Sequence, residues 1–225
     1  MTRSAVSSDI EGREMKRVLL FIMAALMLLS LFSCSLRLNN LGYDKIANTF
    51  TDKSTGNTYT NIPFCFEPII LGDEYAKWNT GEENVIFYEI EGADPALWLA
   101  EEGLTVFLNT REDVPTLREF EPSGVIITVE EVLTVSLAVI NKASDIEALV
   151  EIWENAEAVE LPGATPTLSY SARFTSDLYP WLYYRLVYVE YSDGARYLYD
   201  RESGRCVDAG DIIASYLAGT TDENS

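Results

Sequence analysis

The sequence has no histidine and few basic residues, and each shortage excludes classes of function. Without histidine, the chain cannot use Ser-His-Asp or Cys-His nucleophiles, a histidine general base, or the usual zinc sites. Lys and Arg number 16 against 36 Asp and Glu, so the formal net charge is −20. Because nucleic acid phosphates repel so acidic a chain, we expect no nucleic acid partner.

Motifs that mark common enzymes are also missing. The sequence contains no P-loop, no dinucleotide-binding fingerprint and no S-x-x-K signature. Neighbouring carboxylates such as Glu130 and Glu131 could serve glycoside hydrolysis, but such pairs arise by chance in an acidic chain, and adjacent strand residues point to opposite faces. We assign no catalytic residue, no metal site and no cofactor. Whether the chain is an enzyme stays open, and the sequence leans against it.

What the sequence does contain is a hydrophobic stretch near its start. Lys16 and Arg17 precede an uncharged run over residues 18–33, and Cys34 follows directly. Positive residues, an apolar run and a small residue are the layout of an export signal. The run is also close to the length of a spanning helix, so an uncleaved membrane anchor is the alternative. Both interpretations place the rest of the chain outside the cytoplasm.

The end of this stretch, Leu31-Phe32-Ser33-Cys34, resembles the lipobox of bacterial lipoproteins. Phe32 departs from the small or β-branched residue usual at its position. The resemblance implies cleavage before Cys34 and attachment of diacylglycerol to its thiol, which anchors the protein to the membrane. It covers only Met15 to Cys34 and implies a location rather than an activity.

Residues 1–14 resemble no part of an export signal. We therefore hypothesise that translation starts at Met15. A cellular peptide from Asp9 to Arg13 would contradict this hypothesis.

Lipidation of Cys34 would leave Cys65 and Cys206 as an even pair in an exported protein. Such a pair can form a disulfide. The alternative is two buried free thiols, which behave as small apolar side chains. The sequence leaves both open and favours the thiols.

We predict an α+β fold, mostly antiparallel sheet, with one main amphipathic helix at about 144–155 and short accessory helices. Four apolar residues repeat at i, i+3, i+4 and i+7 in that helix: Ile146, Leu149, Val150 and Trp153. Ser144 and Glu147 match a capping box at its start. A short helix is expected from Asp94-Pro95 to Gly103, and a closing helix over 211–217.

The expected organisation follows from these elements. Residues 1–34 are the signal peptide, 35–48 a tether, 49–122 an N-terminal α/β part, 123–217 a C-terminal sheet-plus-helix part, and 218–225 a polar tail. Pro122 to Gly124 provides the internal boundary.

Strand and turn patterns fill most of the remainder. Residues 133–139 alternate apolar and polar, which predicts a strand that buries Leu133, Val135, Leu137 and Val139. The pattern D-[KR]-x-[ST]-G occurs at 52–56 and again at 200–204. The aspartate side chain can accept hydrogen bonds from the amides of a turn, and glycine readily adopts positive φ. Both segments are therefore predicted to be hairpin turns.

Aromatic residues concentrate near the C-terminal end. Alternation places Trp181, Tyr183 and Tyr191 on one strand face, and Tyr184 and Tyr188 on the other. The first three are a candidate binding surface for sugar rings or a protein partner. Aromatic pairing within the sheet is the alternative, and we favour it.

The function predicted from the sequence is a binding or interaction module at the cell envelope. It would sit on the extracytoplasmic face of the cell membrane through its N-terminal lipid and take a protein or polysaccharide ligand. The alternatives are a carboxylate-dependent hydrolase of cell-wall polymers and a structural accessory subunit of an envelope complex.

Overall fold

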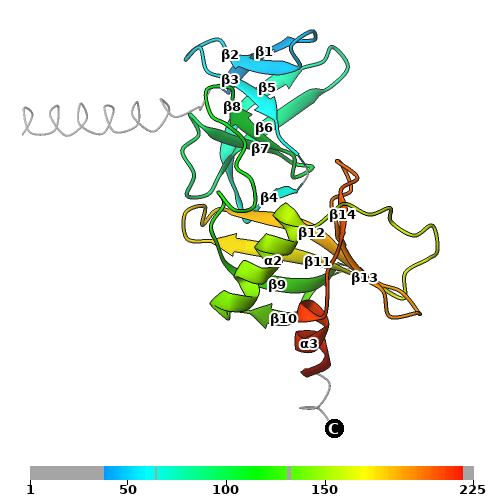
Figure 1. The fold of residues 1–225 in the computed structure, drawn as a ribbon. Helices are drawn as coiled ribbons and strands as arrows, with labels where there is room; N and C mark the ends of the chain where they lie inside the picture. Colours follow the sequence, from blue (N-terminus) through cyan, green and yellow to red (C-terminus); the bar gives the residue numbers. More distant parts are fainter. Residues whose placement is uncertain (1–37, 64, 131–132, 220–225) are drawn as a thin grey trace, which may run out of the picture. The chain divides into compact units, whose positions relative to one another are not determined.

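The computed structural model describes residues 38–63, 65–130 and 133–219. These ranges contain 14 strands and two helices, so this part of the chain is mostly β (Figure 1). The predicted predominance of antiparallel sheet is confirmed. The described residues contain two helices, of 13 and 8 residues, whereas the sequence predicted one main helix with several short ones. The described residues from Asn39 onward form one compact unit.

The first seven-stranded sheet closes into a small barrel. Its strands run in the order β1-β2-β3-β8-β7-β6-β5, and a short parallel pairing of β1 with β5 closes the ring. The strands are β1 (Asn39–Asp44), β2 (Thr49–Asp52), β3 (Thr58–Asn61), β5 (Leu71–Asn79), β6 (Asn84–Ile90), β7 (Trp98–Glu101) and β8 (Val106–Asn109). We call its apolar filling the barrel core, which consists of Leu41, Phe50, Tyr59, Ala76, Phe87, Leu99 and Phe107.

The second sheet is open and entirely antiparallel. Its order is β10-β9-β11-β12-β13-β14, and β4 pairs with part of β12. The strands are β4 (Phe66–Pro68), β9 (Pro122–Glu130), β10 (Thr134–Ile140), β11 (Leu168–Ser176), β12 (Leu182–Glu190), β13 (Arg196–Tyr199) and β14 (Cys206–Asp208).

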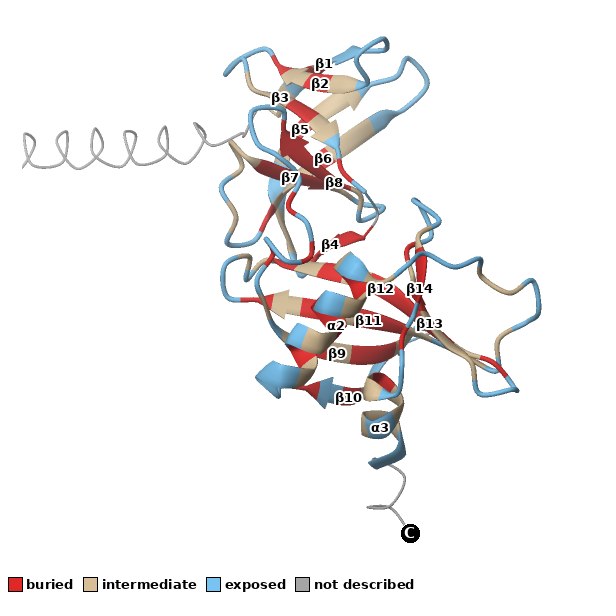
Figure 2. Ribbon diagram, in the orientation of Figure 1, coloured by how far each residue is buried: buried red, intermediate tan, exposed pale blue. Residues whose placement is uncertain are grey.

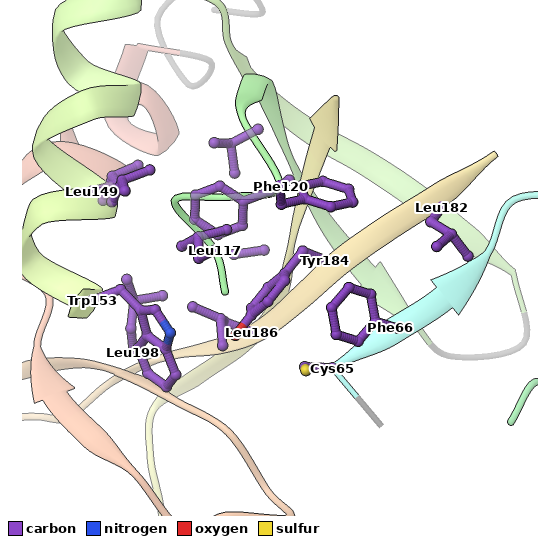
Figure 3. Packing of buried hydrophobic residues seen from close by; sticks show 14 of the residues in the cluster. Cys65, Phe66, Leu117, Phe120, Leu149, Trp153, Leu182, Tyr184, Leu186 and Leu198 are labelled. Atoms are coloured by element: carbon purple, nitrogen blue, oxygen red, sulfur yellow. The ribbon is translucent and has the colours of Figure 1, made fainter. Parts of the chain in front are cut away.

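Both helices contribute their buried side chains to one face of this sheet. Helix α2 (Ala143–Asn155) buries the predicted stripe Ile146, Leu149, Val150 and Trp153, and α3 (Ile212–Gly219) buries Ile213. These residues join side chains of β9, β11 and β12 in the main core, part of which Figure 3 shows. Buried stretches of these strands are red in Figure 2. The core includes Val125, Ile127, Ala172, Leu182, Tyr184, Leu186 and Tyr188. The outward side chains of β7 and β8, such as Trp98 and Leu108, belong to the same core. The outer side of β7 and β8 therefore packs into the main core, while the barrel core remains a separate cluster.

The helix predicted from Asp94 is wrong. Asp94 makes a single turn, in which its carbonyl accepts the amides of Leu97 and Trp98 at 2.9 Å, and β7 follows at once. Leu99 is buried in the barrel core, whereas its neighbours Trp98 and Ala100 are buried in the main core. A strand directs alternate side chains to opposite faces, so it can bury the apolar side chains of this segment in two cores at once.

Two finer predictions also fail. Lys142, rather than Ser144, is the N-cap of α2, and it makes no side-chain capping bond, so the capping box does not form. In β10 the expected register is wrong: Leu133, Val135 and Val139 are exposed, while Ala138 and Ile140 are buried. The pairing of β10 with β9 shifts between Ser136 and Ala138. Such a bulge moves the following side chains to the other face.

The two predicted hairpin turns are confirmed. Asp52 and Gly56 join β2 to β3, and Asp200 and Gly204 join β13 to β14, with amide-to-carbonyl bonds of 2.7–3.0 Å in both turns. Both glycines have positive φ, 78° and 70°, which glycine adopts at little cost. Upstream of the first turn, residues 39–44, which we expected within the tether, form strand β1 of the barrel.

Candidate functional site

Strand β12 divides its side chains between a closed and an open face. Tyr184 and Leu186 point into the main core, whereas Arg185 and Val187 point to the opposite face. Both described helices pack on the core side, so the opposite face carries neither of them. We call this second side the open face of the sheet.

The three aromatic residues predicted as a binding surface do not gather on one patch. Trp181 precedes β12 and packs against the main core, where its Nε1–H is buried without a recorded partner. The Tyr183 ring lies under the guanidinium of Arg173, 5.4 Å from ring centre to Cζ. Tyr191 is only 7% exposed, and its hydroxyl donates to the carbonyl of Pro162 at 3.1 Å.

A cluster of two arginines and two glutamates occupies the open face. Arg173 donates to both carboxylate oxygens of Glu67, at 3.1 and 2.6 Å, and its Nη2 lies 3.1 Å from Glu130. The side chains of Arg173 and Glu67 are only 12% and 11% exposed. Burial removes them from water, and the two-pronged geometry compensates for that loss.

Arg185 stands opposite Arg173 in the strand pairing. Like charges in this position repel each other, and the two glutamates offset the repulsion. However, Arg185 Nη1 lies 3.6 Å from Glu67 and 3.7 Å from Glu130, which is too far for a hydrogen bond. The guanidinium of Arg185 therefore keeps donors available.

Beside this cluster the open face is hollowed into a groove with two lobes. One lobe holds about 200 Å³ and is lined by Glu130, Ser169, Tyr170, Ser171, Arg185, Val187 and Arg201. The other also holds about 200 Å³ and is lined by Arg185, Val187, Tyr199, Asp200 and Arg201. Val187 lies between them, since it pairs with Ser171 on one side and Tyr199 on the other. We call these two lobes together the arginine groove.

Among the residues of this groove and of the adjoining ion-pair cluster, only Glu130 was singled out from the sequence for its chemistry. Arg173 and Arg185 each interrupt an apolar strand, S-A-R-F and Y-Y-R-L. A charged residue at such a position is a signal that one face of the strand is not core. Glu67 gave no such signal, because its partner Arg173 lies 106 positions away, and Arg201 gave none, because it lies in an exposed polar turn.

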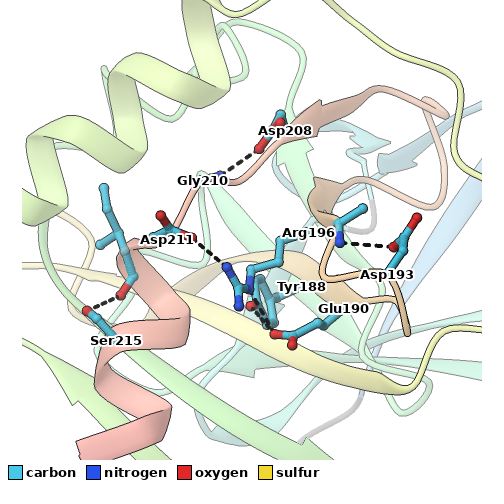
Figure 4. Close-up of polar contacts among 10 residues, drawn as sticks. Tyr188, Glu190, Asp193, Arg196, Asp208, Gly210, Asp211 and Ser215 are labelled. Atoms are coloured by element: carbon cyan, nitrogen blue, oxygen red, sulfur yellow. Dashed lines mark hydrogen bonds and ion pairs between the residues drawn. The ribbon is translucent and has the colours of Figure 1, made fainter.

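The other arginines of the described chain are mostly engaged elsewhere. Figure 4 shows Arg196, whose Nε donates to Glu190 at 2.9 Å and whose Nη1 donates to Asp211, just before α3. Arg205 donates to carbonyls at the end of α2. In the part of the chain that the structure describes, Arg111 and Arg201 have no recorded side-chain hydrogen bond or ion pair.

The two remaining cysteines are buried with free thiols, so the disulfide considered from the sequence is not formed in the structure. Burial, with a smaller contribution from the negative charge of Asp200, raises the pKa of the Cys65 thiol to about 12. Burial also raises the pKa of Cys206. Both thiols are therefore protonated at neutral pH and poorly suited to act as nucleophiles.

Several predicted features lie outside the described residues. Cys34 and the whole hydrophobic stretch belong to residues 1–37, and Glu131 lies in the gap after Glu130. In the described ranges, neither helix has the length and hydropathy to cross a membrane. Within the same ranges, no three Cys, Asp or Glu residues are grouped so as to hold a metal ion.

The chain was compared with models of known protein families, with curated proteins and with solved structures. None of them matches it. The geometry of the open face is therefore the basis for any statement on function.

Proposed function

We propose that the chain is a lipid-anchored protein on the extracytoplasmic face of the cell membrane that binds a ligand of the cell envelope through the arginine groove. The anchor rests on the sequence of residues 15–34, with its basic start, apolar run and Cys34. The binding role rests on one observation, the hollowed open face in which Arg185, Arg201 and Val187 line both lobes.

The arrangement of the elements supports this role. The α+β interpretation, with α2 as the main helix, assigns the helical layer to the core side of the sheet. This leaves the open face for a ligand, backed by strands that are hydrogen-bonded on both sides. Sites built on such rigid elements hold their side chains more precisely than sites on loops.

The carboxylates on this face favour binding over the alternative of hydrolysis. A glycoside hydrolase needs one carboxyl group to donate a proton and a second to act as base or nucleophile. Glu67 instead accepts two hydrogen bonds from Arg173, and Glu130 forms an ion pair with the same arginine. We infer that they position the arginines of the open face rather than react.

The anchor is tested by intact mass spectrometry of the protein extracted from native membranes. The expected product begins at Cys34 and carries diacylglycerol. An unmodified chain that begins at Met1 or Met15 would contradict lipidation and indicate an uncleaved anchor. A Cys34→Ala variant should leave the membrane fraction, and its retention there would support the same alternative.

The binding role is tested by sedimentation with insoluble envelope material from the producing cells. The full-length protein should co-sediment, and Ser169→Trp, which fills one lobe from an exposed position, should not. Ser192→Trp, in the exposed turn after β12, is the matched control and should behave as wild type. Equal sedimentation of all three proteins would refute a role for the groove.

A further inference from the structure

We propose that the arginine groove binds an acidic sugar unit through its carboxylate or phosphate, with Arg201 and Arg185 as the charged donors. This inference rests on the binding function proposed above and names the chemistry of the ligand.

The first argument is that hydrogen-bond donors are free in the groove. Arg201 is exposed, lines both lobes and has no recorded partner among the described residues. Arg185 lines both lobes as well, and its carboxylate neighbours are beyond hydrogen-bond distance. A guanidinium presents its donors in a fork that matches the two oxygens of a carboxylate or phosphate.

The second argument is the local charge. The chain as a whole carries −20, and such a surface repels anions. At the groove the balance differs, because Arg173, Arg185 and Arg201 face Glu67, Glu130 and Asp200 in equal number. The Asp200 carboxylate is already occupied by the amides of the β13–β14 turn, at 3.1 Å each. The groove is therefore close to neutral in a strongly acidic chain, so an oxyanion is repelled less here than by the chain's net charge.

The third argument concerns the uncharged lining. Ser169 and Ser171 offer hydroxyl groups on one side of Val187, and the half-buried Tyr199 lies on the other. Next to Ser171, the hydroxyl of Thr128 is buried without a recorded partner. Hydroxyls beside an apolar and aromatic surface suit a sugar ring, which has polar edges and apolar faces.

The size of the groove limits the ligand. Each lobe holds about 200 Å³, which is below the roughly 300–1,000 Å³ of sites for drug-sized molecules. One lobe thus accepts a single small unit. A polymer would present successive units to the two lobes.

The test uses saturation-transfer difference NMR on the full-length protein in uncharged detergent micelles. The probes are glucuronate, glucose 1-phosphate and neutral glucose. At least one of the two acids should give a saturable signal, and glucose should not. Arg201→Ala should weaken binding of that acid roughly tenfold, as expected when a charge-assisted hydrogen bond is lost. Arg111→Ala removes another exposed arginine, which follows β8 of the barrel and does not line the groove, and should have no effect.

The outcomes separate the ligand sources. A signal from glucuronate alone assigns the groove to carboxylates, one from glucose 1-phosphate alone assigns it to phosphates, and signals from both assign it to oxyanions in general. The proposal is overturned if neither acid gives a saturable signal, if glucose binds equally well, or if Arg111→Ala weakens binding as much as Arg201→Ala.

Failure of this inference can be told from failure of the proposed function. If envelope material still sediments the protein and Ser169→Trp abolishes this, while neither acid binds, then only the acidic-sugar inference is wrong. If the envelope material never binds, the proposed function itself fails.

Discussion

Among single residues, Asp52 shows how a turn aspartate can also hold a barrel together. Its carboxylate is fully buried and accepts from the backbone and hydroxyl of Ser54, from Tyr75 and from Asn39, at 2.7–3.2 Å. Asp200 has the same position in the second turn, but among the described residues its carboxylate accepts hydrogen bonds only from the amides of Glu202 and Ser203. The same turn pattern therefore contributes more side-chain hydrogen bonds in the barrel than in the open sheet.

Asp52→Ala should destabilise the fold by about 1–3 kcal/mol, because it leaves the hydroxyl of Tyr75 and the amide of Ser54 without their acceptor. Asp200→Ala, with its more exposed and less connected carboxylate, should cost less. Urea unfolding followed by tryptophan fluorescence measures both. A cost at position 200 equal to or above that at position 52 would contradict this ranking.

The same residue predicts a pH dependence. Burial acts to raise the pKa of Asp52, but hydrogen bonds from Ser54 and Tyr75 outweigh it and leave the pKa below the ordinary 3.8. A carboxyl group with a lowered folded-state pKa stabilises the fold above its unfolded pKa, and this contribution is lost as the pH falls through the folded pKa. The stability gap between wild type and Asp52→Asn should be large at pH 7 and shrink below about pH 4. A gap that stays constant from pH 7 to pH 3 would disprove it.

The thiol of Cys65 should be chemically silent in the folded protein. With a pKa of about 12, its thiolate fraction at pH 8 is roughly 1,000-fold below that of a free cysteine. Iodoacetamide should leave Cys65 unmodified in native protein and alkylate both Cys65 and Cys206 in concentrated urea without reductant. If alkylation in urea requires prior reduction, the two cysteines are disulfide-bonded in the cell.

At the scale of elements, helix α2 depends on a cation from a distant hairpin. Arg205 donates to the carbonyls of Trp153 at 2.8 Å and of Ala156 at 3.2 Å, and its guanidinium lies 5.4 Å from the Trp153 ring. It thereby satisfies acceptors at the end of α2 and places a positive charge at the negative end of the helix dipole.

Arg205→Ala should therefore lower the free energy of unfolding by about 1–3 kcal/mol. Arg205→Lys should lower it less, since a lysine keeps the charge but not the fork. Arg201→Ala, in the same hairpin but without a recorded partner, is the control and should unfold like wild type. Thermal denaturation monitored by circular dichroism would compare the three, and an undiminished midpoint for Arg205→Ala would remove this role.

The elements that could be predicted are those whose pattern is local. The apolar stripe of α2 and the aspartate–glycine turns depend on residues a few positions apart, and the structure contains both. The segment after Asp94 could not be assigned, because its strand conformation follows from two hydrophobic cores that only the folded chain creates. The register of β10 was lost for a similar reason, since a bulge against β9 is a property of the pair.

The candidate site was largely beyond the sequence. Glu67 and Arg173 meet across 106 positions, and the strand pairing that brings β4 to β12 has no local signature. The predicted aromatic surface does not form, because its side chains have different partners. Trp181 packs against the main core, Tyr183 lies under the guanidinium of Arg173, and Tyr191 donates to the carbonyl of Pro162.

For the whole molecule, the net charge of −20 predicts that salt stabilises the fold. Acidic groups repel each other at low ionic strength, where the Debye length is about 30 Å at 0.01 M, and salt shortens it to about 8 Å at 0.15 M. The melting temperature should rise by a few °C over this range in calorimetry. A fall would mean that exposed ion pairs such as Arg118 with Glu147 outweigh the general repulsion.

The two sheets differ in their edge strands, and this difference affects how readily the protein aggregates at high concentration. The barrel is closed by a short pairing of β1 with β5, so each of its strands has a neighbour on both sides. The other sheet ends in β10, a seven-residue strand without charge or proline, with Val135 and Val139 about half exposed. An uncharged edge of this kind recruits further strands. Aggregation of the protein at high concentration should therefore begin at β10, and the barrel strands should take no part in it.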